Sequence, residues 1–204
     1  MRTVTRDFSS TLRIKSSKFI GYLMPCADEA EKESGLERIR EEHPVATHHC
    51  YGYIYNPADP VSYSSDDGEP SGTAGQPILN ALLSANLMNV LMVAVRYYGG
   101  TQLGKPGLIE AYGEITRLTV NEAELKKIIP VQIYRVVYDY NQQSLIDQLH
   151  HHIDLITLDA EYTEKVKLTL ACPVSMKDQF LFHIEKFKHL LESFEVMETS
   201  WHIF

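Results

Sequence analysis

The order of strand and helix patterns after Pro130 constrains the fold more than any other feature of the sequence. Alternating apolar residues predict strands, and apolar residues at helical spacing predict helices. Together they predict strands over 131–140, 153–162, 165–172 and 194–204, with helices over 142–151 and 175–191. Strand, helix, strand, strand, helix, strand is the split βαβ order of a ferredoxin-like domain. Because this order needs no other part of the chain, we expect a boundary near residue 129, with domains over 1–128 and 129–204.

The first 128 residues predict an α/β domain built around one apolar strand. Residues 89–98 are the most apolar strand pattern in the chain, which is typical of a strand at the centre of a sheet. Further strands are predicted within 10–24 and over 47–55, and helices over 27–42, 77–86 and 108–125. Asp28 followed by Glu31 predicts a capping box at the start of the first helix. Two loops that contain glycines, 63–77 and 99–107, precede the other two helices, so the fold class expected for the whole chain is α+β.

The charge balance argues against a protein that coats nucleic acid through bulk charge. The 204 residues include 19 Lys and Arg against 27 Asp and Glu, a formal net charge of −8. Residues 1–128 carry 13 basic and 16 acidic side chains, and residues 129–204 carry 6 and 11. Any contact with nucleic acid is therefore expected to be a small local patch.

Several sequence features predict a cytoplasmic protein without a membrane partner. The longest apolar run, Val90 to Val95, is far shorter than the roughly 20 residues that span a membrane. The first residues lack the apolar core of a signal peptide. Cys26, Cys50 and Cys172 show no CxxC spacing and are interpreted as reduced thiols. The sequence leaves the oligomeric state open.

The first glycine loop predicts a site for an anion. Its glycines and hydroxyl groups stand just before a helix, where backbone N–H groups and the helix dipole favour phosphate. The candidate contacts are Ser71, Gly72, Thr73 and Gly75. In the alternative interpretation, Thr73 or Gln76 caps the helix and the glycines only make turns. The loop does not match GxxxxGK[ST], which argues against a Walker-type NTPase.

Three carboxylates in the same loop, Asp66, Asp67 and Glu69, are candidate ligands for Mg²⁺. Their spacing does not match an EF-hand, and the alternative is that they are solvated turn residues. They would also repel a neighbouring phosphate unless a cation lay between them. Mg²⁺ is the one cofactor that the sequence suggests.

The second glycine loop follows the apolar strand and offers charged and aromatic side chains. In the functional interpretation, Arg96 and Lys105 contact a phosphate, and Tyr97 or Tyr98 stacks on a base beside Gly99 and Gly100. In the structural interpretation, Arg96 is buried and pairs with Asp66, Asp67 or Glu69. His48-His49-Cys50 opens a strand whose alternation separates His49 from its neighbours, which favours structural histidines over a metal site or a nucleophile.

These motifs together resemble the signature of the YigZ/IMPACT family. The matching residues are Ser65–Gly75, Val95–Gly100, Leu103-Gly104, His48-His49-Cys50 and Ala111-Tyr112-Gly113. The resemblance covers the whole chain in the bacterial two-domain arrangement. Two positions depart from the pattern: Gln76 stands where relatives often have Lys, and Lys105-Pro106 replaces a smaller and more flexible pair.

The resemblance implies a fold for each half of the chain. The N-terminal domain is expected to be similar to the second domain of a small-subunit ribosomal protein, a fold shared with GHMP kinases. The C-terminal domain is expected to be ferredoxin-like, and the pair resembles consecutive domains of elongation factor G. Eukaryotic relatives regulate translation through a kinase-activating partner, an interaction that is not carried over to this chain.

The sequence therefore favours a cytosolic binding protein that engages RNA or the ribosome and influences translation. Its contacts are expected in a local phosphate-binding site near Arg96 and Lys105, and no residue is assigned a catalytic role. Two alternatives remain open. One is a Mg²⁺-dependent enzyme acting on a phosphorylated small molecule or nucleotide, and the other is an adaptor that binds a protein.

Overall fold

The apolar segment predicted at the centre of a sheet is the central strand in the computed structural model, which describes residues 1–204. This strand, β6 (Val90–Tyr97), pairs antiparallel with β3 (Ser17–Pro25) and with β4 (His48–Tyr55). β2 (Phe8–Ile14) and β5 (Val61–Ser65) are the edges of the sheet, whose order is β2-β3-β6-β4-β5.

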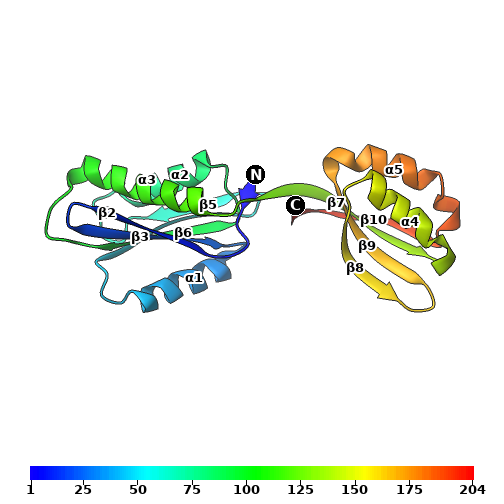
Figure 1. Cartoon of the computed structure of the whole chain (residues 1–204), viewed down its shortest axis with the longest axis horizontal. Helices are drawn as coiled ribbons and strands as arrows, with labels where there is room; N and C mark the ends of the chain where they lie inside the picture. Colours follow the sequence, from blue (N-terminus) through cyan, green and yellow to red (C-terminus); the bar gives the residue numbers. More distant parts are fainter. The chain divides into compact units, whose positions relative to one another are not determined.

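Helices cover both faces of this sheet (Figure 1). α1 (Glu29–Glu42) packs on one face, and α2 (Gly75–Ser84) and α3 (Gly104–Glu122) pack on the other. On the α1 side, Leu91, Val93 and Val95 of β6 belong to one buried cluster. The alternate residues of β6 point to the α3 side. Two covered faces explain why the strand is apolar at nearly every position.

The start of α1 confirms the predicted capping residues. The Glu31 backbone N–H donates to Asp28 Oδ1 at 2.9 Å. The Glu31 side chain in turn accepts from the Ala27 N–H at 2.7 Å. The first bond satisfies a backbone donor that the first turn of a helix leaves without a partner, and the second ties down the residue just before the N-cap.

The structure differs from the sequence prediction at the two loops. The segment 63–77, predicted as one loop, begins in the exposed edge strand β5, and α2 starts at Gly75. α3 starts at Gly104, ahead of the predicted residue 108, because Pro106 is tolerated in a first turn that does not use its backbone N–H. The second loop is therefore shorter than predicted.

The remaining elements occur in the order predicted after Pro130. A short strand, β1 (Arg2–Thr3), pairs with the first residues of β7. The elements that follow are β7 (Lys126–Tyr138), α4 (Gln143–His152), β8 (Ile156–Tyr162), β9 (Val166–Pro173), α5 (Lys177–Glu185) and β10 (Ser193–Ile203). β9 pairs antiparallel with β7 and β8, and β10 pairs with β7. Both helices pack on one face of this sheet (Figure 1).

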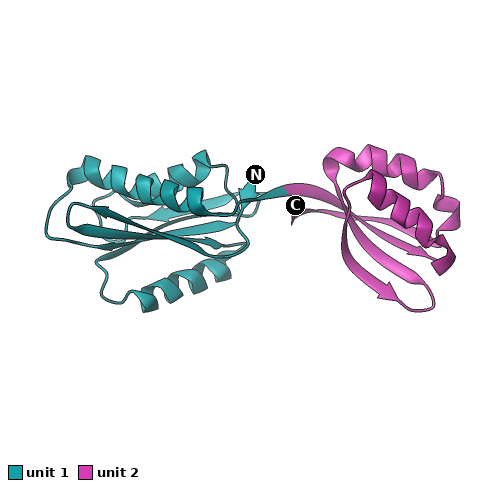
Figure 2. Ribbon diagram, in the orientation of Figure 1, with its two compact units in different colours: residues 1–128 teal, residues 129–204 magenta.

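The chain divides into two compact units, Met1–Ile128 and Ile129–Phe204 (Figure 2). The division falls at the boundary proposed from the sequence. The second unit has its own core, in which Tyr134, Leu170 and Phe180 are fully buried. No helix combines the length and the apolar character needed to cross a membrane.

Candidate functional site

The N–H groups of the first glycine loop bind a carboxylate of the chain itself. Asp66 Oδ1 accepts from the backbone N–H groups of Ala74 and Gly75, each at 2.9 Å. Its Oδ2 accepts from the N–H of Gly72 at 2.8 Å. Asp66 thus occupies the position at the start of α2 that the sequence analysis assigned to a phosphate.

The pKa of Asp66 reflects these bonds. Burial alone would raise the pKa of the carboxyl, but the N–H donors of Gly72, Gly75 and Ala74 lower it below its ordinary value of 3.8. Hydrogen bonds to the ionised form stabilise that form. Asp66 is therefore held as an anion against the positive end of the α2 dipole.

The other candidates in this loop do not cap α2. The Thr73 hydroxyl donates to the carbonyl of Pro70 at 2.6 Å, and Gln76 Nε2 donates to Asn80 Oδ1 at 2.8 Å. Ser71 is exposed. The alternative in which Thr73 or Gln76 caps the helix is thus wrong, because Asp66 makes the capping bonds from outside the helix.

Arg96 and Glu69 form a buried ion pair between the two loops. Arg96 Nη1 lies 2.5 Å from Glu69 Oε1, and both side chains are about 95% buried. Arg96 Nη2 donates to the Ser17 hydroxyl at 3.4 Å. Arg96 Nε is buried without a hydrogen-bond partner. The structural interpretation of Arg96 is confirmed, with Glu69 as the partner.

Glu69 also connects Arg96 to a row of buried, hydrogen-bonded polar side chains. The Tyr112 hydroxyl donates to Glu69 Oε1 at 2.8 Å, and Cys50 Sγ donates to the Tyr112 oxygen at 3.3 Å. Burial raises the pKa of both the Cys50 thiol and the Tyr112 hydroxyl far above their ordinary values. Neither group is ionised near neutral pH, so the Cys50 thiol is not present as the reactive thiolate.

The two neighbouring histidines serve different contacts, as strand alternation predicts. His48 Nδ1 lies 2.8 Å from the carbonyl oxygen of Asp67, and His48 Nε2 lies 3.9 Å from Glu69 Oε1. The backbone N–H of His49 donates to Asp67 Oδ2 at 2.6 Å, while its ring reaches the carbonyl of His43. Both histidines fix the loop that carries Asp67 and Glu69.

The three carboxylates considered for Mg²⁺ therefore have separate partners. Asp66 binds the start of α2, Asp67 binds the His49 backbone, and Glu69 binds Arg96 and Tyr112. No group of three or more His, Cys, Asp or Glu side chains is arranged to hold a metal ion.

A cavity of about 330 Å³ lies beside the ion pair, between the two glycine loops. Glu69 and Pro70 line it from the first loop. Arg96 and Tyr98 line it from the end of β6 and the residue after it, and Gln102 and Lys105 line it from the second loop and the start of α3. The Arg96 guanidinium carbon lies 5.3 Å from the centre of the Tyr98 ring, which is 45% exposed. The cavity thus brings together Arg96, Tyr98 and Lys105.

Tyr97 lies away from this cavity because it follows Arg96 on the opposite face of β6. Its hydroxyl lies 2.8 Å from His43 Nδ1, on the α1 side. Residue 99 must be glycine for a structural reason, because a Cβ there would lie 2.0 Å from the Ser16 carbonyl oxygen. Gly100 has a φ of +83°, which favours glycine.

Sequence reasoning missed Ser17 and Gln102 at this site. Ser17 accepts hydrogen bonds from Arg96 and from the Gly99 N–H, although it lies about 80 residues away in the chain. Sequence spacing does not show which residues of two paired strands lie side by side, because the register of the pairing is not known from the sequence. The motif Ala111-Tyr112-Gly113 did point to Tyr112, but without its hydrogen bond to Glu69.

Comparison with known proteins places this chain among described families. Residues 15–120 match the Impact N-terminal domain, and residues 136–181 match a domain of unknown function, DUF1949. An IMPACT family member from Haemophilus influenzae is 37% identical over 161 residues, which cover 77% of each chain. IMPACT family member YigZ of Escherichia coli is 33% identical over 169 residues, 82% of this chain and 83% of YigZ.

A solved structure resembles the whole chain. It is described as the crystal structure of an hypothetical protein, and it is 29% identical with a TM-score of 0.63. The match covers 96% of this chain and 95% of that chain. With the domain matches and the relatives, it agrees with the resemblance seen in the motifs, and this chain belongs to the IMPACT family.

Proposed function

We propose that this chain is a cytosolic protein that binds RNA or the ribosome and influences translation. The observation that carries the proposal is the cavity in which Lys105 and Tyr98 meet the Arg96–Glu69 pair. A cation beside an accessible aromatic ring is what proteins use to hold a phosphate and stack the adjoining base. Membership of the IMPACT family supports the part of the proposal that concerns translation, since eukaryotic relatives regulate translation.

Charge in the cavity favours an anionic ligand. Glu69 compensates Arg96 within the buried pair, so the pair contributes little net field. Lys105 is exposed and adds a positive charge that the pair does not neutralise. A phosphate at this position therefore gains its attraction from Lys105.

The first loop supports this site because it positions Glu69 and Pro70, which line one side of the cavity. Because Asp66 occupies the N–H groups of Gly72 and Gly75, we assign the phosphate contact to Lys105 in place of the predicted set Ser71, Gly72, Thr73 and Gly75. The Thr73 hydroxyl and backbone N–H both donate to the Pro70 carbonyl, which fixes Pro70 at the cavity. Gly99 and Gly100 shape the opposite wall.

The proposal includes the fold names that the resemblance implies. The order β10-β7-β9-β8, with both helices on one face, supports a ferredoxin-like fold for residues 129–204. The sheet with helices on both faces supports the ribosomal-protein-like fold for residues 1–128. No observation favours the alternative of a Mg²⁺-dependent enzyme.

Binding of a labelled single-stranded RNA of about 12 nucleotides, followed by fluorescence anisotropy, tests the proposed site. Lys105→Ala and Tyr98→Ala should each weaken binding about tenfold, because they remove the phosphate contact and the stacking surface. Lys127→Ala is the matched control, since Lys127 is an exposed lysine of the same unit outside the cavity. Equal binding by the wild type and all three variants would contradict the proposal.

A further inference from the structure

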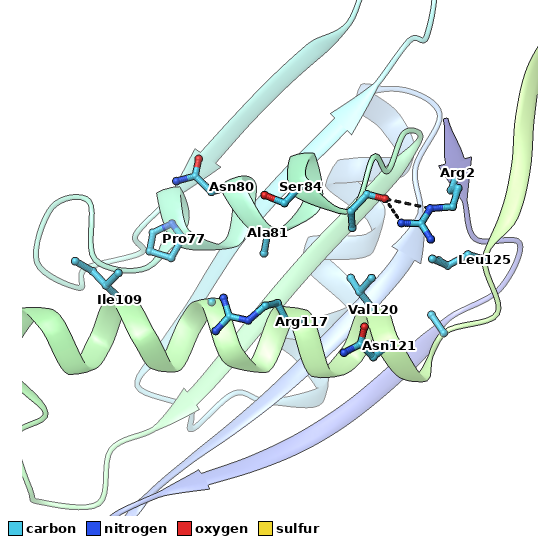
Figure 3. A pocket seen from close by; sticks show the side chains of 13 residues that line it. Arg2, Pro77, Asn80, Ala81, Ser84, Ile109, Arg117, Val120, Asn121 and Leu125 are labelled. Carbon is cyan, nitrogen blue, oxygen red and sulfur yellow. Dashed lines mark hydrogen bonds between the residues drawn. The ribbon is translucent and has the colours of Figure 1, made fainter.

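A second cavity of the first unit lies elsewhere, between α2 and α3. Its volume is about 720 Å³, and its lining includes Arg2, Asn80, Ser84, Ile109, Arg117 and Asn121. We call it the α2/α3 groove. Figure 3 shows α2, which carries Asn80, Ala81 and Ser84, beside the helix that carries Arg117 and Asn121.

The charge of the α2/α3 groove is opposite to the charge of the chain. Its thirteen lining residues include two arginines and no aspartate or glutamate, although the chain has a net charge of −8. Arg2 is held in place because Nε and Nη2 donate to the Ala85 carbonyl at 3.2 and 2.5 Å. Arg117 lies against Gly113 and has no acidic partner. The lining of the groove therefore carries two basic side chains and no acidic one.

The uncharged polar residues of the groove add hydrogen-bond donors. Gln76 Nε2 donates to Asn80 Oδ1 at 2.8 Å, which occupies the acceptor of Asn80 and leaves its amide NH₂ group free. Ser84 and Asn121 are both exposed along the same groove. A ligand that supplies negative acceptors matches this set of donors.

The apolar part of the groove identifies the kind of ligand. Ile109 is 46% exposed, and the other apolar lining is aliphatic, with no Phe, Tyr, Trp or His. Single-stranded nucleic acid depends on aromatic stacking, which the groove does not offer. Aliphatic contacts next to arginines suit a protein segment that carries both leucine-like and acidic side chains.

The dimensions favour a helix as the bound form of that segment. From Ile109 to Asn121 the groove follows α3 for about 18 Å, or roughly three turns. Ala81 in the lining has only a methyl side chain, so another helix can approach the α2 side of the groove closely. We propose that the α2/α3 groove docks an acidic amphipathic helix of a partner protein, with its carboxylates on Arg117 and Arg2.

A titration of the ¹⁵N-labelled full chain with a synthetic peptide tests this proposal by NMR. The probe is an amphipathic helix of about 15 residues with Glu on one face and Leu on the other, and the control peptide carries Gln in place of Glu. We expect the Glu peptide to shift amide signals of residues 77–85 and 109–121, and the Gln peptide to bind at least about tenfold more weakly.

Matched variants locate the contact. Arg117→Glu should weaken binding of the Glu peptide at least about tenfold, whereas Arg13→Glu makes the same charge change at an exposed strand position and should have little effect. Ser84→Trp should block the groove sterically without changing the charge. Lys105→Ala, which tests the proposed RNA site, should leave peptide binding unchanged, so the two proposals fail separately.

Three outcomes would overturn the docking proposal. The first is that the Glu peptide shifts no groove signal at millimolar concentration. The second is equal loss in Arg117→Glu and Arg13→Glu, which would mean unspecific attraction. The third is that polyuridylate or pyrophosphate shifts these signals in place of the peptide, which would assign the groove to RNA or to a small anion.

Discussion

Arg96 holds the polar interior of the first unit together at the scale of single residues. It lies on the central strand and is surrounded by Glu69, Ser17 and the ring of Phe19. The Glu69 carboxylate is nearly fully buried, and the other basic side chain near it, His48, lies farther away at 3.9 Å. The two charges therefore depend on each other, and removal of one leaves the other without compensation in a medium of low polarity.

Arg96→Met should lower the free energy of unfolding by about 3–5 kcal/mol, because it leaves the Glu69 carboxylate buried and unpaired. The double variant Arg96→Met/Glu69→Gln should recover more than half of this loss, since the glutamine side chain keeps an acceptor for the Tyr112 hydroxyl without a charge. Urea unfolding followed by circular dichroism measures both. A double variant as unstable as the single one would contradict the ion-pair account.

Two buried tyrosines of the second unit allow a matched comparison of a hydroxyl with a hydrogen-bond partner and a hydroxyl without one. The Tyr134 hydroxyl is buried without a partner, whereas the Tyr138 hydroxyl donates to Gln143 Oε1 at 2.7 Å. Tyr134→Phe should therefore leave stability unchanged or raise it by up to about 1 kcal/mol, and Tyr138→Phe should lower it by about 1 kcal/mol. Trp201, the one tryptophan, lies in this unit and reports its unfolding by fluorescence. Equal effects would argue against the assigned hydrogen bonds.

At the scale of elements, α2 depends on a capping residue that lies well outside the helix. Asp66 satisfies three N–H groups at the start of α2, and Ala74 at the N-cap position makes no side-chain capping bond. This arrangement ties the loop to the helix. It also fixes the segment that places Glu69 beside Arg96.

Asp66→Asn should lower the free energy of unfolding by about 1–2 kcal/mol at about pH 7. Because the pKa of Asp66 is lower in the folded chain than its ordinary value of 3.8, the ionised carboxylate stabilises the fold above that value. This contribution is lost as the pH falls through the folded-state pKa, so the difference between wild type and variant should shrink in acid. Urea unfolding at about pH 7, 5 and 3 measures it, and a difference independent of pH would contradict the capping role.

The helices and strands were largely predictable from the sequence, but the side chains that contact one another between them were not. Apolar periodicity is local, so it predicted the order of helices and strands after Pro130 and the central position of β6. The edge strand β5 was missed because it is only five residues long, and the alternation of Val61 and Tyr63 with serines is too short to stand out from the adjoining loop. Glycine spacing predicted an anion at the start of α2, but spacing alone does not distinguish an external phosphate from Asp66.

At the scale of the whole molecule, a net charge of −8 does not exclude local basic sites, and two such sites carry the proposals. One is Lys105 at the cavity beside Arg96, and the other is the α2/α3 groove with Arg2 and Arg117. Both lie in the first unit, Met1–Ile128, which the Impact N-terminal domain largely covers. Local charge, and not the total, decides which anionic partners each place attracts.

The dependence of RNA affinity on salt tests the central claim most directly. For a single strand, each neutralised phosphate adds about 0.7 to the slope of log affinity against log salt concentration. If Lys105 neutralises one phosphate, Lys105→Ala should reduce the slope by about 0.7, and Lys127→Ala should leave it unchanged. An identical slope for wild type and Lys105→Ala would show that no phosphate lies on Lys105, which would contradict the proposed site.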